Sequence, residues 1–131
     1  MANVYDIASY ILQRTGEITT WQLQKLVYYS QAWSLAWDDK PLFEERIESW
    51  SNGPVVPELF HQHQGHFYIA HLPKGNPDAL DPLEKETVDA VLEHYASFDG
   101  ETLKKLTHSE EPWQRARNWL PEEVPCNAEI T

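Results

Sequence analysis

The sequence contains little cysteine and little glycine, and each shortage removes a class of site. Its single cysteine, Cys126, cannot form an internal disulfide, and it excludes a zinc site built from several cysteines. Only 5 of the 131 residues are glycine, and no glycine-rich loop that binds phosphate groups is present. Cys126 follows Pro125 in a tail that lacks the strand–turn–helix setting of a catalytic nucleophile. We therefore expect neither enzymatic activity nor a cofactor.

Long apolar runs are also missing. No stretch approaches the roughly 20 apolar residues that cross a bilayer. The first residues, MANVYDIASYILQRTG, have neither the basic start nor the small-residue cleavage site of a signal peptide. The sequence therefore predicts a cytoplasmic protein without membrane contact.

Basic residues are scarce. The chain has 10 Lys and Arg against 21 Asp and Glu, which gives a net charge of −11. Because phosphate groups are bound by Lys and Arg, this balance disfavours binding to nucleic acid. It favours attraction to a basic partner, although many soluble proteins are simply acidic.

Histidines gather in the segment HQHQGHFYIAH, which raises the question of a metal site. His61 and His63 are two positions apart, so on a helix they point to different faces, and a glycine interrupts the helix before His66. Glu58 and His61 form one Glu-x-x-His pair, but a di-iron bundle needs that pair twice. We expect no metal and interpret these histidines as solvated polar residues.

Apolar residues recur at helical spacing along most of the chain. A first helix is predicted between Asn3, a favourable N-cap, and Gly16. The strongest helical pattern opens with a Thr19–Gln22 capping box and continues to about Trp37. Shorter helices are predicted to begin at Pro57, Pro82, residues 99–100 and Pro112.

A minor β element is predicted between the second and third helices. The segment 46–50 alternates as a strand does, and a possible short strand at 67–70 could pair with it. Between them, Asn52 and Gly53 form a turn in which Gly53 is expected to have positive φ. The sequence therefore predicts a mainly α fold, with residues 1–131 forming a single compact helical domain.

Aromatic residues are frequent, with 6 Trp, 6 Tyr and 4 Phe. Such side chains serve large cores, where they pack with prolines and hold loops, and they also serve binding surfaces. On the second helix, Lys25 and Tyr29 lie off the main apolar face. Tyr28 and Tyr29 are adjacent, so one of them is expected to face outward. Tyr28, Tyr29 and Trp37 are therefore the candidates for a partner surface.

Three blocks of the sequence carry a resemblance to a known family. They read LQKLVYYSQAWSLAW, KPLFEERIESWSNGPVVPELFHQHQG and LTHSEEPWQRAR. In order and spacing they resemble the Panacea domain, the family of the SocA antitoxin and the phage-associated protein GepA, from about Tyr5 to Trp119. The positions that match the family motif are Gln24, Lys25, Leu26, Tyr28, Trp33, Trp50, Gly53, Pro54, Val55, Pro57, His108, Pro112 and Trp113.

The resemblance implies a mostly helical domain that binds and neutralises a toxin protein encoded beside it. In SocA the domain is also an adaptor that hands its toxin to the ClpXP protease. Relatives continue into a final helix, which is expected to be missing or shortened here. Two alternatives are a DNA-binding regulator, since antitoxins often repress their own operon, and a diverged prophage protein of unknown partner. An enzyme acting through His108 has the least support.

Overall fold

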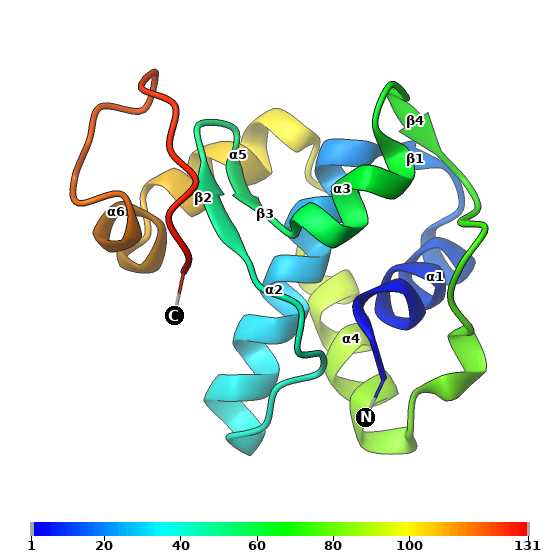
Figure 1. Cartoon of the computed structure of the whole chain (residues 1–131). Helices are drawn as coiled ribbons and strands as arrows, with labels where there is room; N and C mark the ends of the chain where they lie inside the picture. Colours follow the sequence, from blue (N-terminus) through cyan, green and yellow to red (C-terminus); the bar gives the residue numbers. More distant parts are fainter. Residues whose placement is uncertain (1, 131) are drawn as a thin grey trace.

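The helix α2, Thr20–Asp38, is the central element of the fold, and most other elements pack against it (Figure 1). The computed structural model describes residues 2–130. α2 begins at the predicted capping box. The Thr19 hydroxyl accepts a hydrogen bond from the Gln22 backbone N–H at 3.1 Å, and the Gln22 side chain accepts one from the Thr19 N–H at 2.9 Å. The box satisfies N–H groups that a helix start leaves without partners.

The other helices begin and end close to the predicted signals. α1, Val4–Thr15, starts at an Asn3–Asp6 capping box and ends at Gly16, whose N–H donates to Leu12 O at 2.8 Å. The remaining helical elements are α3 (Pro57–His63), the 3₁₀ turn η1 (Pro77–Ala79), α4 (Pro82–Tyr95), α5 (Gly100–His108) and α6 (Glu111–Ala116). The predicted mainly α fold is confirmed. Within residues 2–130, no helix is long and apolar enough to cross a bilayer.

The strands form two separate antiparallel pairs. β2, Glu48–Trp50, pairs with β3, Gly53–Val55, and β1, Ile18–Thr19, pairs with β4, Tyr68–Ile69. The predicted strands near 46–50 and 67–70 are both present, but the prediction that they pair with each other is wrong. The chain turns back directly after Trp50, so β3 occupies the edge of β2. The later strand reaches β1 instead, where the Thr20 N–H donates to Phe67 O at 2.9 Å.

The C-terminal tail runs along the free edge of β2 (Figure 1). The Ser49 N–H donates to Ala128 O, and the Ile130 N–H donates to Ile47 O, each at 2.8 Å. Glu48 and Glu129 form an antiparallel bridge between these bonds. The tail therefore covers backbone groups that an edge strand would leave unpaired.

The hydrophobic core lies where α1, α2, α3 and α4 meet. Fully buried aliphatic side chains from these four helices include Ile7, Ile11, Leu23, Val27, Leu59, Val88 and Val91. Burial of one such side chain stabilises the fold by about 1.5–3 kcal/mol. Because this core holds the first half of α2, the β2–β3 hairpin that packs against it has a fixed position.

Candidate functional site

The β2–β3 hairpin brings together residues that are distant in the sequence. β3 packs against α2 and α5, and β2 packs against α6. Eight of the residues that match the family motif gather around this hairpin, and we call them the hairpin cluster: Gln24, Lys25, Trp50, Gly53, Pro54, Val55, His108 and Trp113. Their contacts show what the motif does in the fold.

Gln24 attaches the end of the hairpin to α2. Its side-chain Oε1 accepts a hydrogen bond from the Val56 N–H at 2.9 Å, and its Nε2 lies 3.4 Å from Val56 O. The same Nε2 lies 2.9 Å from Nε2 of His63. An amide nitrogen only donates, so this ring nitrogen accepts and carries no proton. Burial lowers the pKa of His63, in agreement with a neutral ring. The prediction that His63 is solvated is wrong, because α3 turns it towards α2.

Lys25 is completely buried beneath the hairpin. Its Nζ lies 3.4 Å from Pro54 O and 5.1 Å from the centre of the Trp21 ring, and no described carboxylate pairs with it. Desolvation, with a smaller contribution from Lys104, lowers the pKa of Lys25 to about 7. Lys25 lies off the main apolar face of α2, yet it is buried, because the hairpin and α5 cover that side of the helix.

Trp113 joins α6 to the hairpin. Its indole Nε1 donates to Trp50 O at 2.9 Å, and its ring stacks on His108 with a centroid distance of 3.8 Å. Nδ1 of His108 lies 3.2 Å from a carboxylate oxygen of Glu122, yet burial lowers the pKa of His108. Nε2 of the ring is buried without a partner in the described chain. These contacts make His108 a packing residue between α5, α6 and the tail.

Arg117 is a buried cation that the sequence reading missed. Its guanidinium lies 4.6 Å from the Trp113 ring centre and donates to Ser49 O at 3.0 Å and to Pro121 O at 2.8 Å. It therefore ties the tail to β2. In the sequence, the stretch QRAR resembles the exposed basic end of a short helix, and no local signal marks Arg117 as buried.

Tyr28 and Tyr29 are both buried, so the prediction that one of them faces outward is wrong. Tyr29 stacks on Tyr95 of α4 at 4.2 Å, and its hydroxyl donates to Glu110 Oε1 at 2.9 Å. Burial and Glu110 raise the pKa of Tyr29, and burial also raises the pKa of Glu110. α2 is covered on two sides, by α4 and by the segment before α6, which is why neighbouring tyrosines can both be buried.

The second half of α2 emerges from this covering. Trp37 is 60% exposed and lies 4.8 Å, ring centre to ring centre, from the half-buried Trp33. Both are remote from the hairpin cluster. Two further motif residues mark helix starts, since Pro57 is the first residue of α3 and Pro112 the second of α6. Leu26 belongs to the core.

An open groove runs beside the second half of α2, with a volume of about 420 Å³. The 41–47 segment, the start of α6 and the C-terminal tail form its other walls. We call it the α2 groove. Its apolar lining includes Tyr28, Ala32, Leu35, Phe43, Ile47 and Ile130. The α2 groove therefore places Tyr28, one of the candidate partner residues, beside an apolar surface.

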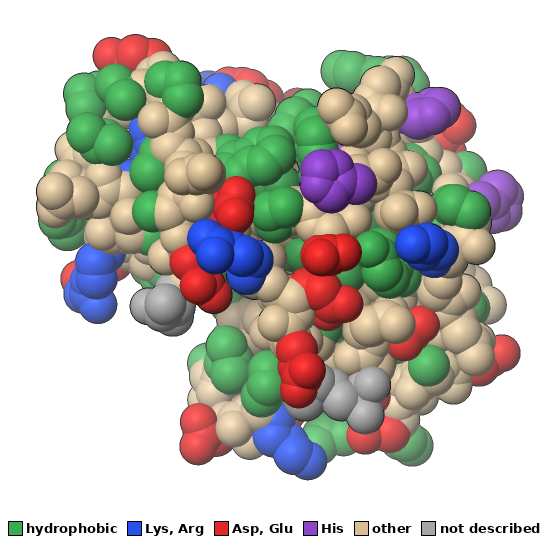
Figure 2. Space-filling view, in the orientation of Figure 1, with side chains coloured by type: hydrophobic (Ala, Val, Ile, Leu, Met, Phe, Trp, Pro, Cys, Tyr) green, Lys and Arg blue, Asp and Glu red, His purple; other side chains and the backbone are tan. Residues whose placement is uncertain are grey.

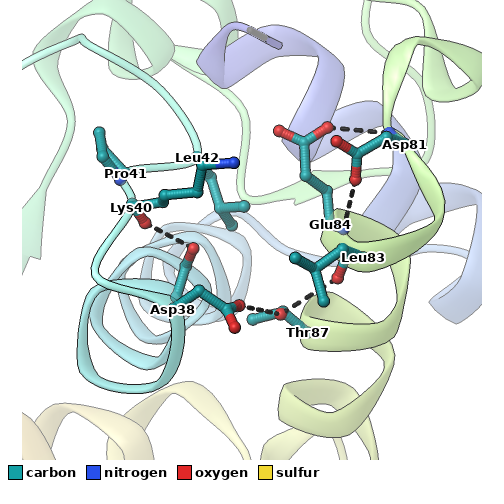
Figure 3. Close-up of a pocket in the computed structure, with 9 residues that line it drawn as sticks. Asp38, Lys40, Pro41, Leu42, Asp81, Leu83, Glu84 and Thr87 are labelled. Atoms are coloured by element: carbon teal, nitrogen blue, oxygen red, sulfur yellow. Dashed lines mark hydrogen bonds between the residues drawn. The ribbon is translucent and has the colours of Figure 1, made fainter.

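A smaller pocket of about 240 Å³ lies between the end of α2 and the start of α4 (Figure 3). Its acidic groups are engaged in local structure. Asp81 and Glu84 form the capping box of α4, with hydrogen bonds of 2.8 and 2.9 Å, and Asp38 lies 3.5 Å from the Thr87 hydroxyl. The acidic side chains of this pocket therefore stabilise the start of α4 and do not form a reactive centre.

Groups of metal ligands do not gather in residues 2–130, where no three His, Cys, Asp or Glu side chains are placed to hold an ion. Cys126 has Ser49 Oγ 3.8 Å from its Sγ, and among residues 2–130 neither side chain forms a hydrogen bond with a histidine. The cluster around the hairpin consists of contacts that position backbone segments. Together, the helical fold and the motif residues that hold its elements define a small, mainly helical domain with a structural motif around its hairpin.

The comparison with known families agrees with this class. The family described as antitoxin SocA-like, Panacea domain, matches residues 23–114, which is more than half of the chain. The chain therefore belongs to this family, and the resemblance seen in the sequence is confirmed. The match extends from α2 to α6 and contains the whole hairpin cluster. No curated protein and no solved structure matches the chain.

Proposed function

We propose that this chain is an antitoxin that binds a toxin protein encoded beside it and neutralises it. The family match over residues 23–114 carries the proposal. Neutralisation by contact needs an exposed binding surface and no catalytic centre. The α2 groove and the exposed Trp37 offer such surfaces, whereas the hairpin cluster is buried apart from the half-buried Trp50 and holds the surrounding elements in place.

Two of the three candidate partner residues remain suitable. Trp37 is exposed on α2, and Tyr28 lines the α2 groove. Tyr29 is withdrawn as an anchor, because stacking on Tyr95 and its bond to Glu110 hold it inside. Large aromatic side chains dominate the energy of many protein interfaces, which supports Trp37 as an anchor.

Co-expression tests the proposal. The product of the neighbouring reading frame is expressed alone and together with this chain, and growth is followed. We expect growth arrest by that product and relief by this chain, with the two proteins co-purifying. A neighbouring product that is harmless alone, or that does not co-purify at low salt, would remove the antitoxin role.

Delivery of the toxin to the ClpXP protease is a separate step of the proposal, supported by the resemblance to SocA, and it places the chain in the cytoplasm. The toxin's half-life, measured with and without this chain in cells that have or lack ClpXP, tests it. An adaptor shortens the half-life only when ClpXP is present. An equal half-life in both strains means that binding alone neutralises.

The charge of the chain argues against the alternative function, a DNA-binding regulator. With a net charge of −11, the chain repels the phosphate backbone that supplies most non-specific affinity. A retardation assay with the promoter DNA of its own operon is expected to show no complex at physiological salt.

A further inference from the structure

The α2 groove is a real hollow of the molecular surface. Figure 2 shows it between the part of the molecule that carries α6 and the C-terminal tail and the part formed by the end of α2. Hydrophobic side chains lie on its lower side, and acidic and basic side chains lie along its upper edge (Figure 2). Its volume of about 420 Å³ accommodates one or two side chains of a partner.

One wall of the groove is an apolar helix surface without a cover. Leu35, on the last turns of α2, is 46% exposed, and Ala32 lies one turn before it on the same side. Phe43, Ile47 and Ile130 line the opposite side. Burial of a leucine-sized side chain is favourable, so this groove suits an apolar anchor.

The floor of the groove carries one unused polar group. Tyr28 is only 5% exposed and lines the groove, and within residues 2–130 its hydroxyl has no hydrogen-bond partner. The other polar side chain of the floor, Gln31, is held by the backbone: it accepts a hydrogen bond from the Leu42 N–H at 2.6 Å and donates one to Phe43 O at 3.0 Å. The hydroxyl oxygen is not among the fully buried polar atoms that lack a partner in these residues, so it is open to the groove and can bond to a group bound there.

The rim of the groove is acidic. Arg46 pairs with Glu48 at 2.9 Å and approaches Glu129 at 3.8 Å, so its charge is compensated. Glu44 and Glu45 also line the rim, and neither forms an ion pair with any described residue. Glu45 accepts a hydrogen bond at 3.2 Å from the Val4 N–H at the start of α1. Glu44 is thus the rim carboxylate without a described partner, and the rim keeps a net negative charge that attracts a cationic group.

We infer that the α2 groove is where the toxin docks, through a segment that inserts an apolar side chain flanked by Lys or Arg. This inference rests on the proposed antitoxin function and names the surface that carries it. The apolar side chain contacts Leu35, a polar backbone group of the segment bonds to the Tyr28 hydroxyl, and the flanking cations face Glu44 and Glu45.

Affinity measurements with the purified product of the neighbouring reading frame test the inference. Leu35→Glu places a charge on the apolar wall and should weaken binding roughly ten-fold or more. Tyr28→Phe removes only the hydroxyl, which has no hydrogen-bond partner among residues 2–130, and should weaken binding about five-fold. Glu44→Lys reverses a rim charge and should slow association. Unchanged melting temperatures show that the variants are folded.

Matched changes outside the groove serve as controls. Leu83 is 47% exposed and Tyr68 is 59% exposed, and neither lines the groove, so Leu83→Glu and Tyr68→Phe should bind as the unchanged protein does. Glu86→Lys is the control for Glu44→Lys. If the neighbouring product binds and the groove variants bind equally well, the groove is the wrong surface and the antitoxin role stands.

If the neighbouring product does not bind at all, the antitoxin role fails. A peptide titration then tests whether the α2 groove binds a basic, apolar segment. A 12-residue peptide of Leu and Lys is titrated into isotope-labelled protein. Amide shifts confined to the groove and lost in Leu35→Glu support a docking site for a basic, apolar segment; shifts elsewhere, or none, overturn it. Sedimentation that shows a dimer broken by Leu35→Glu would assign the groove to a second copy and overturn the toxin as its occupant.

Discussion

Gly53 lies against Lys25 so closely that a Cβ atom on Gly53 would be 2.5 Å from Lys25 Cε. The same atom would be 3.0 Å from Thr107 Oγ1, and the φ angle of Gly53 is 109°. The predicted positive φ is confirmed, and the close approach adds a second reason for glycine. We expect Gly53→Ala to destabilise the fold by about 1–3 kcal/mol, measured by chemical unfolding, and Gly53→Val to cost more.

Gly65→Ala is the control for this prediction. Gly65 also has positive φ, at 88°, but no atom lies within 4 Å of the position that a Cβ would take. Gly65→Ala therefore loses stability through backbone strain alone. The difference between its free energy of unfolding and that of Gly53→Ala measures the effect of the contact with Lys25. Equal losses would show that the buried amine moves aside freely.

The buried amine of Lys25 predicts a dependence of stability on pH. Its pKa is lowered from 10.5 to about 7, so between these values the unfolded state binds more protons than the folded state. Stability should therefore rise with pH across this window, by on the order of 1 kcal/mol per pH unit from this group. Unfolding free energies at pH 7 to 9.5, taken as the difference from Lys25→Met, isolate its contribution. Parallel curves for the two proteins would contradict a depressed pKa.

The helix starts could be predicted from the sequence because capping is local chemistry. Asn3, Thr19 and Asp81 each lie three residues before a side chain that completes the capping box, and all three boxes form. Positive φ at Gly53 was predictable for the same reason, since the Asn-Gly pair marks the turn.

The predictions that failed concern burial and strand pairing that depend on segments distant in the sequence. Lys25 and Tyr29 are polar or lie off the main apolar face of α2, and helical periodicity does not reveal that a hairpin and a fourth helix cover them. The partner of β2 also depends on the immediate return of the chain after Trp50. Arg117 is buried because the tail folds over it and because its guanidinium reaches Ser49 O on β2, 68 positions earlier in the chain.

Gln24 predicts a loss from buried hydrogen bonds. Gln24→Leu keeps a buried side chain of similar length but leaves the Val56 N–H without its acceptor at 2.9 Å and Nε2 of His63 without its donor at 2.9 Å. An unsatisfied buried donor costs about 1–3 kcal/mol, so we expect a lower free energy of unfolding by that amount. The exposed Gln13 on α1 offers the control, and Gln13→Leu should change stability by less than about 0.5 kcal/mol. Similar losses at both positions would argue against the pairing.

Trp113 predicts a loss of similar size at the other end of the hairpin cluster. Trp113→Phe keeps an aromatic ring beside His108 but removes the N–H that donates to Trp50 O at 2.9 Å. We expect a destabilisation of about 1–3 kcal/mol from the lost bond and the smaller ring. Trp119 is 61% exposed, so Trp119→Phe is its control and should have little effect on the melting temperature. A Trp113 variant as stable as the Trp119 variant would show that α6 is held by other contacts.

Charge and aromatic anchors should affect toxin binding at different steps. With a net charge of −11, this chain should associate with a basic toxin roughly ten-fold or more faster at low salt than above 0.15 M. Trp37 is exposed and bears no charge, so Trp37→Ala should leave that salt dependence unchanged and raise the dissociation rate. Glu44→Lys should do the reverse, with slower association and nearly constant dissociation. Stopped-flow association and surface-based dissociation rates, measured at several salt concentrations, separate the two effects. An association rate that does not depend on salt would show that the acidic surface has no part in finding the toxin.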